Sequence, residues 1–187
     1  MKRVIRLPNR FARTTKRLLT EVYWLRTEQK ALQMLEGRDH IGVDFFLVAY
    51  TALGGDRLIR LVRVFENSKK VASFWYLYRC DPKRIEQLLK VTGTQLSELE
   101  DLSDRLRVIR NKVFVHIDKQ GVFNPSAIYQ LAAIKGKSVQ QAIEALWHVF
   151  SQLYREVTGT DFQYDEYSGD DILRLLELRA RDPRRLG

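Results

Sequence analysis

Residues 101–120 read DLSDRLRVIRNKVFVHIDKQ, and this stretch decides the fold class. Its apolar positions recur every three or four residues, the spacing of a helix buried along one stripe. They are Leu102, Leu106, Ile109, Val113 and Ile117. On a helical wheel at about 100° per residue, Arg110 and His116 flank that stripe. The other side is apolar at Phe114 and Val115, so we expect a second surface, such as another subunit, to cover it.

The rest of the chain also predicts helices, with no run of alternating strand residues. We expect a basic helix over about residues 10–36 and a second helix over 43–65, in which Gly54 and Gly55 mark a bend or a close helix contact. Further helices are expected over 83–91, capped by Asp81 and Pro82, and over 172–181, after an acidic loop for which turn and N-cap chemistry is the favoured role. The aromatic residues at 74–78 favour a core; stacking on single-stranded nucleic acid is the second interpretation.

Positive charge is concentrated at the start of the chain. The sequence has 32 basic and 23 acidic side chains, and residues 1–30 carry nine basic against two acidic ones, which is +7 of the net +9. This asymmetry suggests a polyanionic partner, with Arg13, Arg17 and Trp24 on one helix face as RNA contacts. A solvated helix face is an equally good interpretation. The acid-free, Arg-rich first twenty residues are also typical of mitochondrial transit peptides.

Several classes of protein are excluded by composition. The longest apolar stretch, residues 43–53, contains Asp44 and is about half of the roughly 20 residues that a membrane crossing needs. The single cysteine, Cys80, forms no intrachain disulfide, which points to a reducing compartment and a cytoplasmic protein. No phosphate-binding or dinucleotide-binding glycine motif is present. His40, His116 and His148 have no ligand partner at helical spacing, so we expect neither a metal nor a cofactor.

Arginine, asparagine and histidine within seven residues suit phosphodiester chemistry. Arg110 can hold a phosphate and stabilise the charge of a pentacoordinate transition state. Asn111 can orient a phosphate oxygen, and His116 can accept the proton of a ribose 2′-OH. A twofold dimer would supply the second proton-transfer group, since no other histidine is near in sequence. Caps and salt bridges are the alternative roles for these side chains.

The string from Arg110 to His116 resembles the R-x(4–6)-H motif of the HEPN superfamily, in its RN-xxxx-H form. The wider string IRNKVFVHIDK, residues 109–119, is similar to the AbiU-type abortive-infection branch, and the resemblance covers about residues 39–159. It implies one all-α domain over residues 1–187: a HEPN-like helical bundle over 39–159, with additional helices over 10–36 and, after the acidic loop, up to 182. Such bundles dimerise through the motif helix.

The resemblance also implies an activity and its residues. Arg110 and His116 would cut RNA without metal, with Asn111 as the accompanying polar residue and Lys112 as an RNA contact. We expect a metal-independent endoribonuclease that leaves 2′,3′-cyclic phosphate ends, in phage defence or a toxin system, with RNA, a second copy and a cognate antitoxin or regulator as partners. The alternative is a non-catalytic RNA- or nucleotide-binding dimer, or an antitoxin-like partner. Asp118 stands where one toxin branch has a tyrosine that is adenylylated, and Val115 stands where a small residue is common; both are departures from the pattern.

Overall fold

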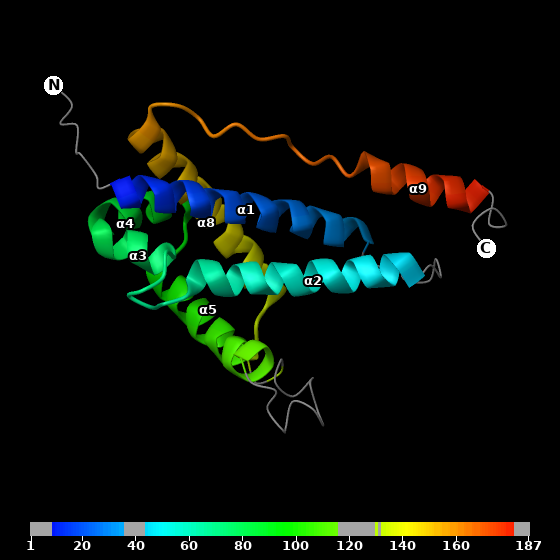
Figure 1. Ribbon diagram of the computed structural model, residues 1–187, viewed down its shortest axis with the longest axis horizontal. Helices are drawn as coiled ribbons and strands as arrows, with labels where there is room; N and C mark the ends of the chain where they lie inside the picture. Colours follow the sequence, from blue (N-terminus) through cyan, green and yellow to red (C-terminus); the bar gives the residue numbers. More distant parts are fainter. Residues whose placement is uncertain (1–8, 36–43, 116–129, 131, 182–187) are drawn as a thin grey trace.

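The computed structural model describes residues 9–35, 44–115, 130 and 132–181. All regular structure in these ranges is helical, which confirms the predicted all-α class (Figure 1). The elements are α1 (Asn9–Leu35), α2 (Asp44–Phe65), α3 (Phe74–Cys80), α4 (Pro82–Thr92), α5 (Leu96–Ile109), the π-helical segment η2 (Arg110–Val115), α8 (Gly136–Thr158) and α9 (Asp170–Arg181). None of the described helices is long and apolar enough to cross a membrane.

Helix α1 is the centre of the bundle. It packs against α8 on one side and α2 on the other. Its inner face is fully buried at Phe11, Leu19, Val22 and Leu25. The helix predicted over residues 10–36 is therefore confirmed up to Leu35. This segment therefore contributes directly to the core.

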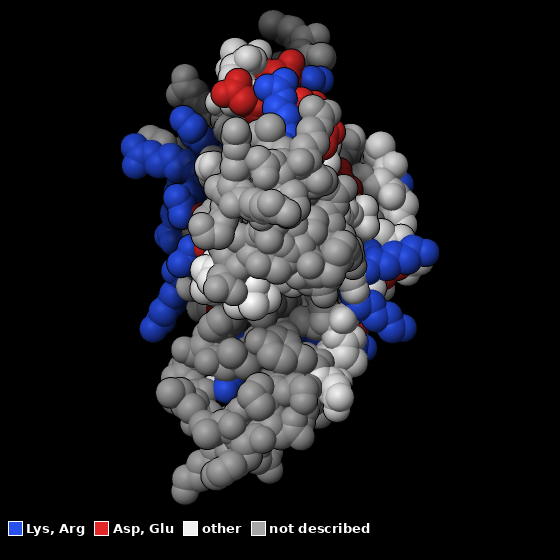
Figure 2. All heavy atoms as spheres, turned by 90° about the vertical axis from the view of Figure 1, so that its right-hand side faces the viewer, with Lys and Arg blue, Asp and Glu red and all other residues white. Residues whose placement is uncertain are grey.

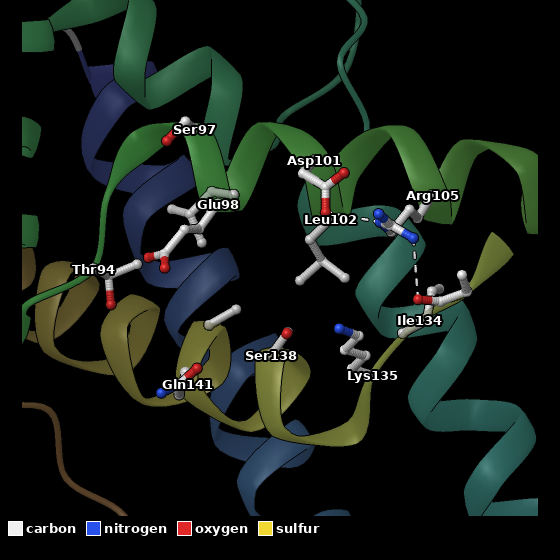
Figure 3. Close-up of a pocket in the computed structure, with 13 residues that line it drawn as sticks. Thr94, Ser97, Glu98, Asp101, Leu102, Arg105, Ile134, Lys135, Ser138 and Gln141 are labelled. Carbon is white, nitrogen blue, oxygen red and sulfur yellow. Dashed lines mark hydrogen bonds and ion pairs between the residues drawn. The ribbon is translucent and has the colours of Figure 1, made fainter.

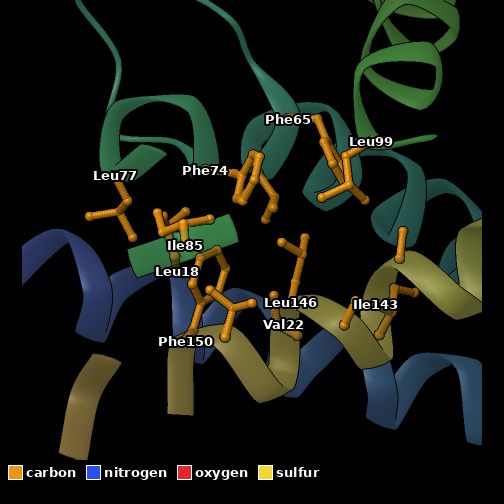
Figure 4. Packing of buried hydrophobic residues seen from close by; sticks show 14 of the residues in the cluster. Leu18, Val22, Phe65, Phe74, Leu77, Ile85, Leu99, Ile143, Leu146 and Phe150 are labelled. Atoms are coloured by element: carbon orange, nitrogen blue, oxygen red, sulfur yellow. The ribbon is translucent and has the colours of Figure 1, made fainter. Parts of the chain in front are cut away.

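The other half of the core comes from α8 and the short helices. Figure 4 shows Phe150 and Leu146 of α8 facing Leu18 and Val22 of α1, with Phe74 and Ile85 closing the cluster. Helix α8 is amphipathic, and its apolar face is buried. This face includes Ala142, Leu146, Val149 and Leu153. This packing holds α1 and α8 together.

Helix α2 departs from the prediction at its paired glycines. The helix continues without interruption through Gly54 and Gly55, and Figure 1 shows it straight. A Cβ built at either glycine meets no other atom within 4 Å. The expected bend or close contact is therefore wrong. The physical reason is that this part of α2 faces outward, as the 64% exposure of both Leu47 and Val48 shows.

The aromatic segment α3 belongs to the core. Phe74, Trp75 and Leu77 are buried, which confirms the core interpretation and makes nucleic-acid stacking wrong for Phe74 and Trp75. Tyr76 and Tyr78 are half-buried and pack against the same core. The predicted cap of α4 is also confirmed, because the Asp81 carboxylate accepts the backbone N–H of Arg84 at 3.1 Å.

An extended loop, residues 160–169, leads from α8 to α9. The Ser168 hydroxyl accepts the backbone N–H of Asp170 at 3.2 Å, and Gly169 adopts a positive φ of 80° before the first turn of α9. The favoured interpretation of the acidic tail, turn and N-cap chemistry, is thus confirmed. The loop also packs Phe162 against Trp147 of α8, so it is attached to the bundle.

Candidate active site around Arg110

Helix α5 leads directly into the predicted catalytic motif, which begins at Arg110. It begins with a capping box in which the Glu98 carboxylate accepts the backbone N–H of Gln95 at 2.9 Å. Its buried stripe is confirmed as far as Ile109, which is 2% exposed. The stripe comprises Leu99, Leu102, Leu106 and Ile109. Arg110 follows directly, so it lies where the core meets the surface.

The backbone changes at Arg110 from an α-helix to a π-helix, which extends to Val115. In a π-helix the hydrogen bonds join residues five apart, so each turn is wider than in an α-helix. The α-helical wheel expected for residues 101–120 is therefore wrong over residues 110–115, and residues 116–120 lie outside the described residues. Single π-helical turns are rare and occur frequently at functional sites. Here the π-helical segment coincides with the motif that begins at Arg110.

The guanidinium of Arg110 is engaged on all its donor nitrogens. Its Nη1 forms an ion pair with the Glu66 carboxylate at the end of α2. Its Nε and Nη2 both donate to Asn111 Oδ1, at 3.0 and 2.8 Å. The Arg110 side chain is 31% exposed and the Glu66 side chain 19%, so the pair is only partly screened by water. The planar guanidinium is thus held in one orientation.

A buried network fixes the element that presents Glu66. The carbonyl of Phe65 accepts hydrogen bonds from the Ser103 hydroxyl at 2.9 Å and from Trp75 Nε1 at 3.0 Å. Trp75 Nε1 also donates to Ser103 Oγ at 3.1 Å. These bonds join the end of α2 to α3 and α5. They fix the positions of Glu66 and Arg110 relative to each other.

Arg110 and Glu66 line a small surface cavity of about 80 Å³. The cavity also contains residues of α5 and of the segment after α2; they are Val62, Phe65, Asn67, Ser103, Asp104, Leu106 and Arg107. Such a volume accommodates a few waters or one small anionic group, whereas whole-ligand pockets are several times larger. The cavity is therefore large enough for one phosphate-sized group and too small for a whole nucleotide.

The structure brings together only part of the predicted site. Arg110 and Asn111 are in direct contact. Lys112 is half-buried and takes part in an interaction of its own. His116 lies outside the described residues, as do the side chains of residues 113–115. The imidazole of His148, on α8, is not among the residues that line the cavity.

The predicted nucleic-acid contacts lie on α1, which contributes no residue to the Arg110 cavity. Arg13 is exposed, and Arg17 is 67% exposed although it pairs with Glu21 at 2.5 Å. Trp24 is 43% exposed, with the Arg60 guanidinium 5.8 Å from its ring centroid. Figure 2 shows lysine and arginine side chains projecting along both flanks of the molecule. Arg13, Arg17 and Trp24 therefore lie outside the Arg110 cavity.

A larger pocket of about 300 Å³ between α5 and α8 has a structural explanation (Figure 3). Among the described residues, three of its four charged side chains bond within the fold, Lys135 being the exception. Asp101 pairs with Arg105 at 2.7 Å, and Arg105 Nη1 donates to the carbonyls of Ala132 and Ala133. Glu98 belongs to the capping box. This pocket is therefore a joint between helices. Within the described ranges no three histidine, cysteine, aspartate or glutamate side chains could hold a metal ion.

Sequence reasoning missed Glu66 and the π-helical segment. Glu66 is 44 residues from Arg110, and nothing in its local pattern indicates the pairing. The only available signal was its place directly after an amphipathic helix, where a polar residue is ordinary. The π-helical turn has no compositional signature comparable to a glycine or proline.

Comparison with known protein families identifies one family whose model matches most of the chain. The family model described as AbiU2, a HEPN family, matches residues 8–178. This match is wider than the resemblance over residues 39–159 and includes α1 and most of α9, which agrees with the central position of α1 in the core. No curated protein and no solved structure matches the chain. The chain belongs to the AbiU2 family of HEPN proteins.

Proposed function

We propose that this protein is a metal-independent endoribonuclease of HEPN type that acts as a homodimer in phage defence or a toxin system. The observation that carries the proposal is the Arg110 guanidinium, fixed beside Asn111 at a surface cavity in a chain of the AbiU2 family. Arginine in this position matches the geometry of a phosphate, because its planar fork donates two parallel hydrogen bonds.

The proposed reaction needs one base and one acid. His116 of one copy accepts the proton of the ribose 2′-OH, whose oxygen then attacks the adjacent phosphorus. The bond from phosphorus to the 5′-oxygen breaks, and a second proton donor, supplied by the other copy, protonates the leaving oxygen. The products are a 2′,3′-cyclic phosphate and a 5′-hydroxyl. Arg110 stabilises the charge that develops on the phosphoryl oxygens.

A second candidate function is a non-catalytic RNA-binding dimer or antitoxin-like partner. The observation that favours it is the ion pair of Arg110 with Glu66, because a phosphate at Arg110 must displace an acid that already occupies the guanidinium. The exposed Arg13 and Arg17 would then supply most of the affinity. Such binding falls steeply with salt and survives the loss of His116.

The test compares wild-type, His116→Ala and Arg110→Ala proteins on mixed RNA in excess EDTA. Cleavage by the wild type alone, with 2′,3′-cyclic phosphate and 5′-hydroxyl ends, supports the ribonuclease. Equal cleavage by all three proteins assigns the activity elsewhere and contradicts the proposal. Binding without cleavage by the wild type, alone and with candidate partner proteins present, favours the binding dimer. Sedimentation velocity of the wild type tests whether the protein is a dimer.

A further inference from the structure

We infer that a groove between α1, α8 and the 160–169 loop binds a nucleobase of single-stranded RNA. The inference rests on the proposed action on RNA and concerns target recognition. The groove has a volume of about 280 Å³. Its lining includes Tyr23, Lys30, Gln33, Gln140, Tyr164 and Glu166. This volume is near the lower end of the range for small-molecule pockets, which suits one base with its attached phosphate.

Aromatic rings lead from the basic face of α1 into this groove. The ring centroids of Trp24 and Tyr23 are 5.2 Å apart, those of Tyr23 and Tyr164 5.7 Å, and those of Tyr164 and Trp147 5.0 Å. Both Trp24 at 43% and Tyr164 at 44% remain exposed despite these contacts. Exposed rings beside cations are the usual surface on which bases of a single strand stack.

The wall made by Tyr164 is held in place from two sides. The Tyr23 hydroxyl donates to the backbone carbonyl of Asp165 at 2.9 Å, which ties the loop to α1. Phe162 packs edge-on against Trp147, at 6.3 Å between centroids, which ties the loop to α8. A base that stacks on Tyr164 therefore meets a ring whose position is already fixed, so little conformational freedom is lost on binding.

The polar side chains of the groove suit the edge of a base. Gln33 and Gln140 are exposed and present both donors and acceptors, as a base edge requires. Lys30 provides a cation for the attached phosphate, and Glu166 an acceptor for an exocyclic amino group. Within the described part of the chain none of these four forms a hydrogen bond or ion pair, so they are available to a ligand. Glu144 is different, because Arg26 Nε occupies it at 3.1 Å.

The groove is separate from the Arg110 cavity. The two share no lining residue. In Figure 1 the loop runs above α1, whereas the end of α5 that carries Arg110 lies below α2. A base in the groove would thus be bound away from the bond that is cut. The groove would select the RNA and hold it, and it would take no part in the chemistry.

The test uses a ligand that this chemistry does not cleave. A 2′-O-methyl hexanucleotide of adenine lacks the attacking hydroxyl, so its binding is measured independently of cleavage. Its titration is followed by tryptophan fluorescence, since Trp24 and Trp147 belong to the aromatic path. We expect Tyr164→Ala to weaken binding at least fivefold and Tyr164→Phe, which keeps the ring, to change it less than twofold. Lys83→Ala, at an exposed lysine of α4 that does not line the groove, is the matched control for Lys30→Ala.

A second variant keeps the test valid if Tyr164→Ala disturbs the loop. Gln33→Ala with Gln140→Ala changes two exposed helical positions where alanine is favourable, and we expect at least threefold weaker binding. The proposed role of the groove is overturned if this double variant and Tyr164→Ala both bind the oligonucleotide with wild-type affinity. It is also overturned if the wild type does not bind the oligonucleotide. If the wild type binds through the groove but cleaves no RNA, the ribonuclease proposal fails and the groove stands.

Discussion

Arg110 and Glu66 form an ion pair that joins the end of α5 to the end of α2, across 44 residues of sequence. The pair lies at the margin of the core, with both side chains less than one-third exposed. The Glu66 carboxylate binds Nη1 of the guanidinium, while Asn111 Oδ1 accepts hydrogen bonds from Nε and Nη2. A phosphate that approaches Arg110 therefore competes with Glu66 for the same charge.

Glu66→Gln should strengthen RNA binding. The substitution keeps a hydrogen-bond acceptor near Arg110 but removes the negative charge that repels a phosphate. Loss of one such partly screened interaction is worth about 1 kcal/mol, or roughly a fivefold gain in affinity. Filter binding of uncleavable RNA at low salt measures this. Glu100→Gln, an exposed acid earlier on α5, is the control, and weaker binding by Glu66→Gln would instead make Glu66 a positioning residue for Arg110.

Arg110→Ala should reduce RNA cleavage by roughly 100-fold or more, because it removes the charge that stabilises the transition state. The fold should persist at a cost of about 1 kcal/mol, since Glu66 is left without its partner. Arg155→Ala is the matched control: Arg155, on α8, does not line the Arg110 cavity, is 56% exposed and pairs with the exposed Asp161. Circular dichroism and a cleavage time course separate the two effects. Equal losses in both variants would argue against a specific role of Arg110.

The helices were predictable because local physics defines them. The stripe through Leu102, Leu106 and Ile109 and the cap at Asp81 depend on spacing and on one side chain each, so sequence alone identified them. Helix α1 was predicted with nearly the right bounds for the same reason. Its role was underestimated, however. Basic residues on its outer face suggested an appendage, whereas its buried face makes it the centre of the bundle.

The site was only partly predictable because its remaining contacts are tertiary. Glu66 meets Arg110 only once α2 and α5 have packed, through the Phe65, Ser103 and Trp75 network. The π-helical segment is a backbone adjustment that ordinary helix patterns do not reveal. The bend or close contact predicted at Gly54 and Gly55 was wrong for a related reason. Glycine pairs often mark close helix contacts, but here a Cβ built at either glycine meets no other atom within 4 Å.

Arg13→Ala and Arg17→Ala should weaken RNA binding more at low salt than at high salt. Each removed phosphate contact should lower the slope of log affinity against log salt by about 0.7 for a single strand. Arg17 should have the smaller effect, because Glu21 already neutralises part of its charge. Lys90→Ala, an exposed lysine near the end of α4, is the control. An unchanged slope in both arginine variants would remove α1 from the RNA-binding surface.

A buried ionic cluster between α1 and α2 makes stability depend on pH. Arg60 Nε donates to Glu28 at 2.8 Å and to Asp56 at 2.7 Å, and Nη1 donates to Glu21 at 2.8 Å. Arg57 lies beside them, bonded to Gln29 at 3.1 Å. Burial, and next the hydrogen bond with Asp56, raise the pKa of Glu28 to about 7 despite the opposing charge of Arg60. The folded protein is therefore most stable when the Glu28 carboxyl group is protonated.

Glu28→Gln should remove a loss of stability that the wild type shows as pH rises. The pKa of Glu28 is about 7 in the folded state against 4.5 for an ordinary glutamate. Between these two pH values the folded form therefore keeps the Glu28 proton, whereas the unfolded form has lost it. The contribution is complete below pH 4.5 and gone above about 7, and between pH 5.5 and 8.5 it amounts to at most about 2 kcal/mol. Urea unfolding at both pH values measures it, with the exposed Glu100→Gln as the control. If Glu28→Gln loses as much stability as the wild type over this window, another group is responsible for the pH dependence.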